Sequence, residues 1–522
     1  MLRVVPRIGL SLPLVALLSG CVPTSALKEK PDLSVPAEWG SGRRSETSVS
    51  ETGWVGGFSP SKELESIVAQ AFEFNHDLKA AAARMKAAKA RSIVERAPLF
   101  PQVSTSFQPS RTQRGSTTNN ANVRSGGSAA DRNTLASQSS SSADIRNNFD
   151  LAADISWEID LWGDLRNDRR ASLADAEAAR FDYYAARLSL AANAARTWFN
   201  AIEAGQQMRL AEETLRSFED NLGVVEQMFE RGIEGEGQGD GALDVRLTRA
   251  NVASARGRLR EEERNRDAAV RNLEVLLGQY PAEELSVVPD LPGIASMVPA
   301  GIPSELLLRR PDIRAAEYRL FGTGERVESA RKAFLPSLRL TGSRGFQSED
   351  LDELLRPETI VWNIAGNLTQ PLFQGGRLAG ELKVADANRE EAVHDYAQTA
   401  LTAFREVESA LAADEFLAAQ EAAVREAAIE SKEAEKLAVT QYSRGLVDIV
   451  TVLESQRRSF DSASSLITIS NLRLQNRVDL YLALGGDFSS KLKPEEHPVA
   501  IASNAKMTTA ARRDKRWGGG RR

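Results

Sequence analysis

Residues 149–161 read FDLAADISWEIDL, and this stretch decides what kind of fold the chain adopts. Apolar side chains occupy almost every second position, beginning at Phe149 and ending at Leu161. The positions between them are polar or small, with acidic side chains at Asp150, Asp154, Glu158 and Asp160. A period of two predicts a β-strand with one apolar and one polar face. About thirteen residues is long for a strand in a soluble protein and fits a tilted crossing of a membrane.

Three further stretches, 103–108, 338–341 and 362–369, alternate in the same way, which brings the number of predicted strands to four. Four strands cannot close a barrel, and an open sheet edge in lipid leaves backbone groups unpaired at several kcal/mol each. Single-chain membrane barrels begin at about eight strands. We therefore expect other subunits to complete the sheet. Two chains would supply about eight strands and three about twelve, and the residues alone do not choose between them.

The acidic positions of the first-quoted strand are candidate lumen residues. If the apolar face meets lipid, then Asp150, Asp154, Glu158 and Asp160 line the lumen, where carboxylates favour cations over anions. The alternative is a generic hydrated surface with no influence on selectivity.

The sequence contains an internal repeat. Residues 75–81 read NHDLKAA and residues 310–316 read RPDIRAA, 235 positions later. The spacing falls to 213 between Arg231-Gly232 and Arg444-Gly445, and to 207 between Leu277-Gly278 and Leu484-Gly485. Each fall marks extra residues in the first copy, within 114–147 and within 234–241. Because insertions survive in loops, both places are predicted loop tips of a tandem duplication.

Long helices connect the strands to these tips. The run from Leu165 to Arg231 contains no proline, and at about 1.5 Å per residue it would reach roughly 100 Å. Apolar residues within it step by three and four, which predicts a heptad seam at Phe181, Tyr184, Leu188, Ala191, Ala195, Trp198 and Ile202. The second copy carries Leu401, Phe404 and Leu411 at the equivalent places. Returning helices are expected over 243–277 and 450–484, with shorter helices over 64–96 and 304–331.

The first residues are typical of an export signal. Arg3 and Arg7 precede a short apolar stretch that ends at Leu18-Ser19-Gly20-Cys21. Small residues before a cysteine resemble the lipobox of bacterial lipoproteins, and this resemblance implies cleavage before Cys21 and lipid on its sulfur. Residue 22 is valine rather than aspartate, so we see no signal for retention at the inner membrane. The alternative is an ordinary signal peptide with a chance cysteine.

Composition excludes several classes of function. The chain has one cysteine and three histidines, so a zinc site, a disulfide framework or a Cys/His catalytic pair is not expected. A formal charge of −6 gives no basic excess that would call for nucleic acid. No Gly-x-Ser-x-Gly is present, and we expect no cofactor, no metal and no enzymatic activity.

These boundaries divide the chain into five parts. We expect a lipoprotein signal peptide over 1–20, an extension from the lipid anchor over 21–62, a first structural repeat over 63–290, a second over 291–488, and a basic, disordered tail over 489–522.

Several short motifs together resemble one family. They are the lipobox, the duplicated segments 75–81 and 310–316, Asp160-Leu161-Trp162-Gly163, and the run PLFQGGR at 371–377. The chain is similar to the TolC-like outer-membrane efflux proteins, and more closely to the OprM-type lipoprotein branch, over roughly residues 54–488. The resemblance implies an α+β membrane protein, in which a homotrimer forms a twelve-stranded β-barrel that a long α-helical periplasmic tunnel continues. It also implies an outer-membrane channel that passively conducts efflux or secretion substrates, with a periplasmic adaptor and an inner-membrane pump as partners.

The same resemblance assigns roles to residues at the helical tips. Arg231, Gly232, Arg444 and Gly445 are expected to face the adaptor, although glycines also serve simply to end helices. Asp448 matches an aspartate at the closed periplasmic end of OprM-like channels, and the alternative for it is a cap or turn. Three such carboxylates near one axis would favour cations and raise one another's pKa. Glu454 keeps a charge in the stretch where TolC has gating aspartates.

Two other functions compete with the channel. A lipid-anchored coiled-coil spacer or adhesin explains the heptads but not four two-faced strands. An envelope hydrolase needs a nucleophile–base pair, for which the three histidines show no arranged partner. Within the channel class, the residues do not name the cargo.

Overall fold

The structure is a computed structural model that describes residues 39, 58–59, 62–114, 144–231, 241–294 and 309–486. Cys21, Gly232, most of the predicted loop tips within 114–147 and 234–241, and the basic tail lie outside these residues. The described chain forms two compact units. The first, the strand unit, contains Ala80–Tyr183 and Asp312–Thr399, and the second, the hairpin unit, contains Tyr184–Pro311, the segment before Ala80 and the chain from Ala400. No helix in the described ranges has the length and apolarity that a membrane crossing needs.

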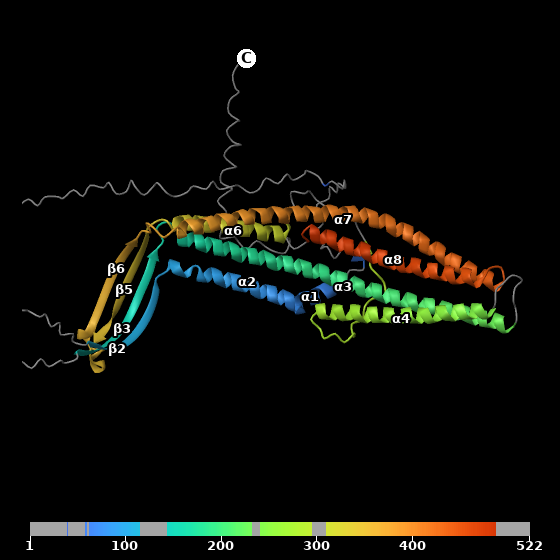
Figure 1. Ribbon diagram of the computed structural model, residues 1–522, viewed down its shortest axis with the longest axis horizontal. Coiled ribbons are helices and arrows are strands. Elements are labelled where there is room, and N and C mark those ends of the chain that lie inside the picture. The colour runs from blue at the N-terminus through green and yellow to red at the C-terminus, as the bar shows by residue number, and fades with distance from the viewer. Residues whose placement is uncertain are drawn as a thin grey trace, which may run out of the picture. The chain divides into compact units, whose positions relative to one another are not determined.

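The strand unit is built on one antiparallel sheet of four strands, which lie side by side in the order β2-β3-β5-β6 (Figure 1). They are β2 (Gln102–Arg114), β3 (Asp144–Ile159), β5 (Ser337–Ser348) and β6 (Ile360–Thr369). All four predicted strands are present. The predicted bounds 149–161 were wrong at both ends, because β3 begins at Asp144 and ends at Ile159. After Ile159 the backbone turns, and the Leu161 N–H donates to the Ile159 carbonyl at 2.8 Å.

Strand register gives this sheet two chemically different faces. Asp154 lies opposite Ser104 of β2 and Ser343 of β5, so polar positions of neighbouring strands fall on the same side. The polar face consists mainly of Ser104, Gln108, Asp150, Asp154, Glu158, Arg339, Ser343, Gln347, Asn363 and Asn367. The other face consists mainly of Val103, Phe107, Leu151, Ile155, Leu338, Leu340, Trp362, Ile364 and Leu368.

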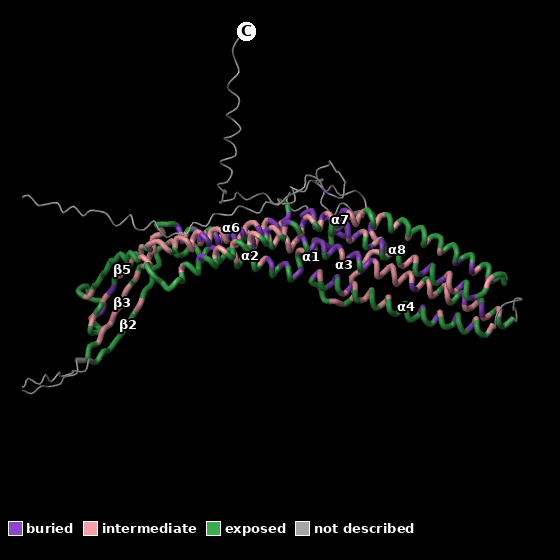
Figure 2. Tube along the Cα trace, turned by 45° about the horizontal axis from the view of Figure 1, so that its top comes forward, coloured by how far each residue is buried: buried purple, intermediate pink, exposed green. Residues whose placement is uncertain are grey.

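The apolar face of the sheet is not covered by the described chain. Trp362 and Ile364 are 72% and 79% exposed, and every residue of β6 is exposed. The strands in Figure 2 are accordingly coloured mainly as exposed or intermediate. An exposed apolar surface of this kind marks contact with lipid or with another protein.

The two outer strands leave the sheet open. Each of β2 and β6 pairs with one neighbour among the described residues, β2 with β3 and β6 with β5. Their outer N–H and C=O groups are therefore free to pair with a strand of another chain.

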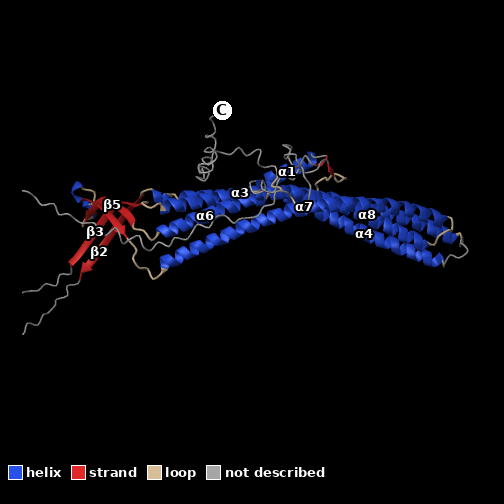
Figure 3. Cartoon of the chain, turned by 90° about the horizontal axis from the view of Figure 1, so that it is seen from above, coloured by secondary structure: helices blue, strands red, loops and turns tan. Residues whose placement is uncertain are grey.

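The hairpin unit is helical (Figure 3). Two helices of 67 residues, α3 (Asp164–Glu230) and α7 (Arg377–Ser443), begin in the strand unit and continue into this unit. Two shorter helices return beside them, α4 (Gly241–Leu276) and α8 (Ile449–Ala483). The hairpin unit also contains α1 (Lys62–Phe74) and a short pairing of β1 (Phe58–Ser59) with β4 (Gly293–Ile294). Most of α2 (His76–Val94) and of α6 (Pro311–Lys332) belongs to the strand unit.

The core of the hairpin unit confirms most of the predicted heptad seam in α3. Ala191, Ala195, Trp198 and Ile202 are all at most 3% exposed. Of the three seam residues predicted in α7, Leu411 is buried at 6% exposure, whereas Leu401 is 54% exposed and was wrong. Ala400, Ala403 and Val407 are also buried, so small residues contribute much of the packed face of α7.

The duplicated motifs meet each other at the ends of the returning helices. In the first copy, the Asn75 side chain donates to the carbonyl of Leu276 at 3.0 Å, and a Cβ on Gly278 would lie 2.8 Å from the Phe74 oxygen. In the second copy, the Arg310 guanidinium donates to the carbonyl of Ala483 at 3.1 Å, and a Cβ on Gly485 would lie 3.3 Å from the Arg309 backbone. Both glycines have positive φ, +72° and +86°. Glycine therefore recurs in the two Leu-Gly pairs because at each of them the backbone of another segment lies too close for a side chain.

Candidate functional site

The polar face of the sheet carries three of the four predicted lumen residues. Asp150, Asp154 and Glu158 are half-buried on β3. The Ser106 hydroxyl donates to Asp154 at 3.4 Å, and Glu158 lies opposite Arg339 of β5. Arg339 also donates to the Ser156 hydroxyl at 3.2 and 3.1 Å. This face therefore holds carboxylates in hydrogen-bonded surroundings, with Arg339 opposite Glu158 and Arg146 on the same side of β3.

Asp160 lies apart from the other three. It follows the last residue of β3, and its side chain is only 8% exposed. The Arg166 guanidinium donates to its carboxylate at 2.7 Å, and the Arg166 backbone N–H donates at 3.2 Å. Asp160 thus fastens the first turn of α3 to the end of the strand, which is a structural role.

The predicted tips lie where the helices of the hairpin unit turn. Arg231 is exposed directly after α3, and its predicted companion Gly232 lies outside the described residues. Arg444 and Gly445 join α7 to α8, and Gly445 has a φ of +74°. The Gly445 N–H donates to the Tyr442 carbonyl at 2.8 Å, and the N–H of the next residue donates to the Gln441 carbonyl at 3.0 Å. This is the left-handed glycine ending that the sequence predicts.

A small apolar core fixes the tip end of the four long helices. It consists of Val225, Val245, Ala438, Tyr442, Ile449 and Val452. Tyr442 is 3% exposed, and burial, with a smaller contribution from the charge of Asp244, raises its phenol pKa to about 12. The tip is therefore a packed structure that holds Arg444 and the start of α8 in place.

Asp448 is the N-cap of α8. Its carboxylate accepts hydrogen bonds from the Thr451 backbone N–H at 2.8 Å and from the Thr451 hydroxyl at 2.7 Å. These two bonds hold the pKa of Asp448 below its usual value. The cap is one of the two roles that the sequence allows for this residue, and in the single chain it is formed.

Glu454 is neutralised by its neighbours on α8. Its carboxylate pairs with Arg457 at 2.8 Å and with Arg458 at 3.1 Å, and these contacts, Arg457 first, lower its pKa. A carboxylate with two guanidinium partners carries little net field, which weakens the prediction that Glu454 acts in a gate.

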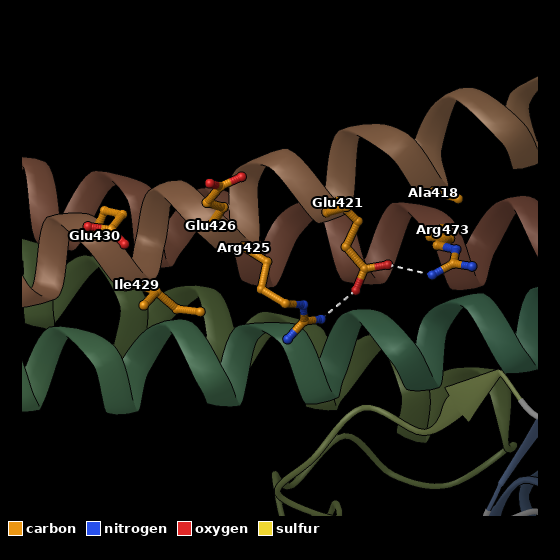
Figure 4. A pocket seen from close by; sticks show the side chains of 8 residues that line it. Ala418, Glu421, Arg425, Glu426, Ile429, Glu430 and Arg473 are labelled. Atoms are coloured by element: carbon orange, nitrogen blue, oxygen red, sulfur yellow. Dashed lines mark hydrogen bonds and ion pairs between the residues drawn. The ribbon is translucent and has the colours of Figure 1, made fainter.

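The sequence analysis did not identify two charged residues with partners on neighbouring elements, Arg339 of β5 and Glu421 of α7. Glu421 of α7 accepts from Arg473 of α8 and from Arg425, each at 2.7 Å (Figure 4). Together with Glu426, Ile429 and Glu430 these residues border a shallow groove of 460 Å³. Arg339 and Glu421 stand at unremarkable helix or strand positions, so only the register between elements reveals their partners. Among the residues that the structure describes, no group of three or more His, Cys, Asp or Glu side chains could hold a metal ion.

Comparison with known proteins places this arrangement in one class, the outer-membrane channels. The Neisseria gonorrhoeae outer-membrane channel MtrE, solved in its open state, superposes with a TM-score of 0.74 at 28% identity and covers 88% of this chain and 98% of its own. Outer membrane protein OprJ of Pseudomonas aeruginosa is 31% identical over 492 residues, 92% of this chain and 96% of its own. The probable outer membrane lipoprotein SilC of Salmonella typhimurium is 28% identical over 499 residues, 91% of this chain and 98% of its own.

The sequence pattern of one family covers most of the chain. The pattern described as outer membrane efflux protein matches residues 67–279 and 302–486. The chain belongs to the outer membrane efflux protein family.

These comparisons confirm the predicted fold class, the function as the outer-membrane channel of an efflux system, and the location in the outer membrane. The helix-rich chain with its four-stranded sheet is consistent with the predicted trimeric barrel and helical tunnel. A spacer or adhesin would leave the two-faced sheet without a purpose. The family is one of efflux channels rather than enzymes.

Proposed function

We propose that three copies of this chain close their sheets into one barrel and join their hairpin units into a hollow stem. Substrates then pass without chemical change from a periplasmic adaptor and an inner-membrane pump to the outside. The chain itself carries no enzymatic activity in this proposal.

One observation supports this assembly most strongly. The sheet combines an exposed apolar face, a polar face and two outer edges that pair with nothing among the described residues. In lipid, an open edge costs several kcal/mol for each unsatisfied backbone group. Pairing of β2 from one chain with β6 of the next removes both edges at once. It also places the carboxylates of Asp150, Asp154 and Glu158 on the inside, where they favour cations.

The remaining site residues take their roles from the same assembly. Arg231 and Arg444 present cations to the adaptor at the two tips, and Asp448 contributes one carboxylate per chain near the axis. Glu454 supplies at most a screened charge, because Arg457 and Arg458 pair with it. Lipid on Cys21 holds the extension 21–62 at the membrane.

Single-particle imaging of the detergent-extracted protein tests the assembly. We expect a hollow particle with threefold symmetry and a long stem, and conductance when the particle is inserted in a planar bilayer. A solid rod, or a compact monomer that conducts no ions, would contradict the proposal. Mass spectrometry of the mature N-terminus separately tests the lipid on Cys21, since an unmodified cysteine thiol would exclude it.

A further inference from the structure

The apolar face of the sheet carries two charged side chains, and both are arginines. Register and the alternation of side chains place Arg111 of β2 and Arg344 of β5 on this face, whereas every carboxylate of the four described strands lies on the polar face. A charge on a lipid-facing surface destabilises a membrane protein unless it reaches the interface or meets an opposite charge. The two arginines are therefore exceptions on a face that the proposed barrel turns toward the membrane.

The side chain of neither arginine forms an ion pair within the ranges that the structure describes, and both residues are exposed. The line across the sheet through Arg344 runs from Ala153 of β3 to Trp362 of β6, and neither of these neighbours carries a charge. A guanidinium has only hydrogen-bond donors. The donors of Arg344 are thus left for an acceptor outside the chain.

Arg344 lies in the outer half of the sheet. The helices join the strands at one end, where α6 ends at Lys332 before β5 and α7 begins at Arg377 after β6. Because the helical stem is periplasmic, the other end of the strands points outward. From Ser337 to Arg344 the height gained is about 18 Å, at about 3.3 Å per residue and a tilt of about 40°. The apolar band of a membrane barrel is about 25 Å tall, so an arginine side chain at this height reaches its outer limit.

The second arginine follows the same distribution. Arg111 lies close to the outer end of β2, opposite Asn147, and the apolar face carries no charged residue on the described strands between Arg344 and the helices. Six positions of β3 separate Asn147 from Ala153, which is roughly 20 Å, so the two arginines meet different molecules. Positive charge on this face is therefore confined to the outer part of the membrane.

Trp362 completes the surroundings of Arg344. It lies directly opposite Arg344 on the neighbouring strand β6 (Figure 1) and is 72% exposed. Residues paired in this way have Cβ atoms about 4.5–5.5 Å apart. An indole offers a flat apolar ring and one N–H donor, and tryptophans concentrate where a membrane meets water. A guanidinium binds phosphate through two parallel N–H bonds. The two side chains together suit a phosphorylated sugar.

We propose that Arg344 and Trp362 bind the phosphorylated headgroup of a glycolipid in the outer leaflet of the outer membrane. That leaflet of a bacterial outer membrane is rich in lipid A, an acylated glucosamine disaccharide with phosphate groups, whereas the inner leaflet consists of phospholipids. Arg344 donates to a phosphate, the Trp362 ring lies against the sugar, and the acyl chains cover Leu340 and Ile364 on the side nearer the helices. This inference rests on the proposed barrel, because that assembly turns the apolar face toward lipid.

Native mass spectrometry of the assembled channel tests the site. The full-length trimer is extracted in mild detergent, stripped of bound lipid and incubated with lipid A. We expect saturable binding to the wild-type trimer, and binding weaker by roughly tenfold in Arg344→Leu, because the charge-assisted contact with phosphate is lost. Lipid A whose phosphates have been removed should bind the wild-type trimer as weakly as intact lipid A binds the variant.

Arg339→Leu is the matched control. It makes the same change of charge on the same strand, but Arg339 lies on the polar face opposite Glu158, so lipid A should bind as it does to the wild-type trimer. Thermal unfolding gives a second readout that also shows whether the variant folds. In lipid-free detergent, Arg344→Leu should melt no lower than the wild-type trimer, because a charge leaves the apolar face. Lipid A should raise the unfolding temperature of the wild-type trimer and not that of Arg344→Leu.

The outcomes separate the inference from the proposed function. Equal binding of lipid A by wild-type and Arg344→Leu trimers overturns the inference and leaves the trimer intact. Phosphatidylglycerol in mixed micelles that displaces lipid A at equal concentration also overturns it, since any anionic headgroup then suffices. An equal loss of binding in Arg339→Leu would show that net charge, and not the apolar face, attracts the lipid. Chains that are monomeric in every variant overturn both the inference and the proposed assembly.

Discussion

Two substitutions of Asp448 distinguish a role as helix cap from a role as charged gate, because one removes only the charge and the other removes both the charge and the cap. Asp448→Asn removes the charge and keeps an N-cap of similar strength. Asp448→Ala removes both, and loses the two hydrogen bonds to Thr451. Loss of a cap costs about 1 kcal/mol, within a range of roughly 0.5–2. Since about 1.4 kcal/mol is tenfold in an equilibrium, the start of α8 should open about fivefold more often in the alanine variant.

Hydrogen exchange measures the role of Asp448 as a cap, and bilayer conductance measures its role as a gate. Exchange at the Thr451 amide should rise about fivefold in Asp448→Ala and stay near the wild-type rate in Asp448→Asn. If three carboxylates also close the periplasmic end, conductance should rise in both variants. The cap has a pH dependence as well. Because the folded pKa of Asp448 is lowered from 3.8, the stability that its charge adds is present above that value. It is lost as the pH falls further, and the asparagine variant should show no such loss.

Two results would refute this reasoning. Equal exchange at Thr451 in the asparagine and alanine variants would show that the carboxylate does not cap α8. A conductance that rises in Asp448→Ala alone would show that the gate responds to loosening of the helix and not to charge.

Three further perturbations follow from the described geometry. Tyr442→Phe should make the tip resistant to alkali. The wild-type phenol has a pKa of about 12 against 10.0 for the free group, so the folded state loses about 2–3 kcal/mol of stability as the pH rises from 10 to 12. An ultraviolet titration combined with hydrogen exchange at the tip measures this loss. Gly345→Val should reduce trimer yield severely, because a Cβ would collide with the Leu151 carbonyl and lie 2.7 Å from the Ala152 Cα, whereas Gly342→Ala, with 3.6 Å of room, should assemble normally on a native gel. Arg339→Ala should make the lumen more cation-selective by severalfold in reversal potentials, and unchanged selectivity would place this face away from the ion path.

Sequence alone predicted the element types because their periods are long and regular. The alternation through Phe149 and Leu161 is sustained enough to predict β3, and the proline-free run to Arg231 predicts α3 to within one residue at each end. Termini were less certain where a turn intervenes, as at Ile159. In α7 the seam residue Leu411 was predicted correctly, but Leu401 was chosen over Ala400 because it is larger, and size does not tell which of two neighbouring positions faces the core.

The site was predicted less completely than the fold. Asp448 was singled out because it matches an aspartate of OprM-like channels, and Gly445 because the Arg-Gly pair recurs in the duplication. Arg339 and Glu421 were missed because their partners, Glu158 and Arg473, are brought near by register between distant segments. Asp160 was assigned to the lumen because it follows the same every-second-residue pattern as Asp150, Asp154 and Glu158, but the strand ends before it.

The open sheet makes chain concentration a thermodynamic variable of this fold. A single folded chain must keep the outer edges of β2 and β6, and the apolar residues around Trp362, in contact with solvent or lipid headgroups. By mass action, its stability then depends on how many neighbours are available to cover them. Dilution in detergent should lower the unfolding temperature of the sheet, as it would for any fold whose last backbone hydrogen bonds are made between molecules. A lone chain, with both strand edges open, is accordingly more prone to aggregate than the assembled channel.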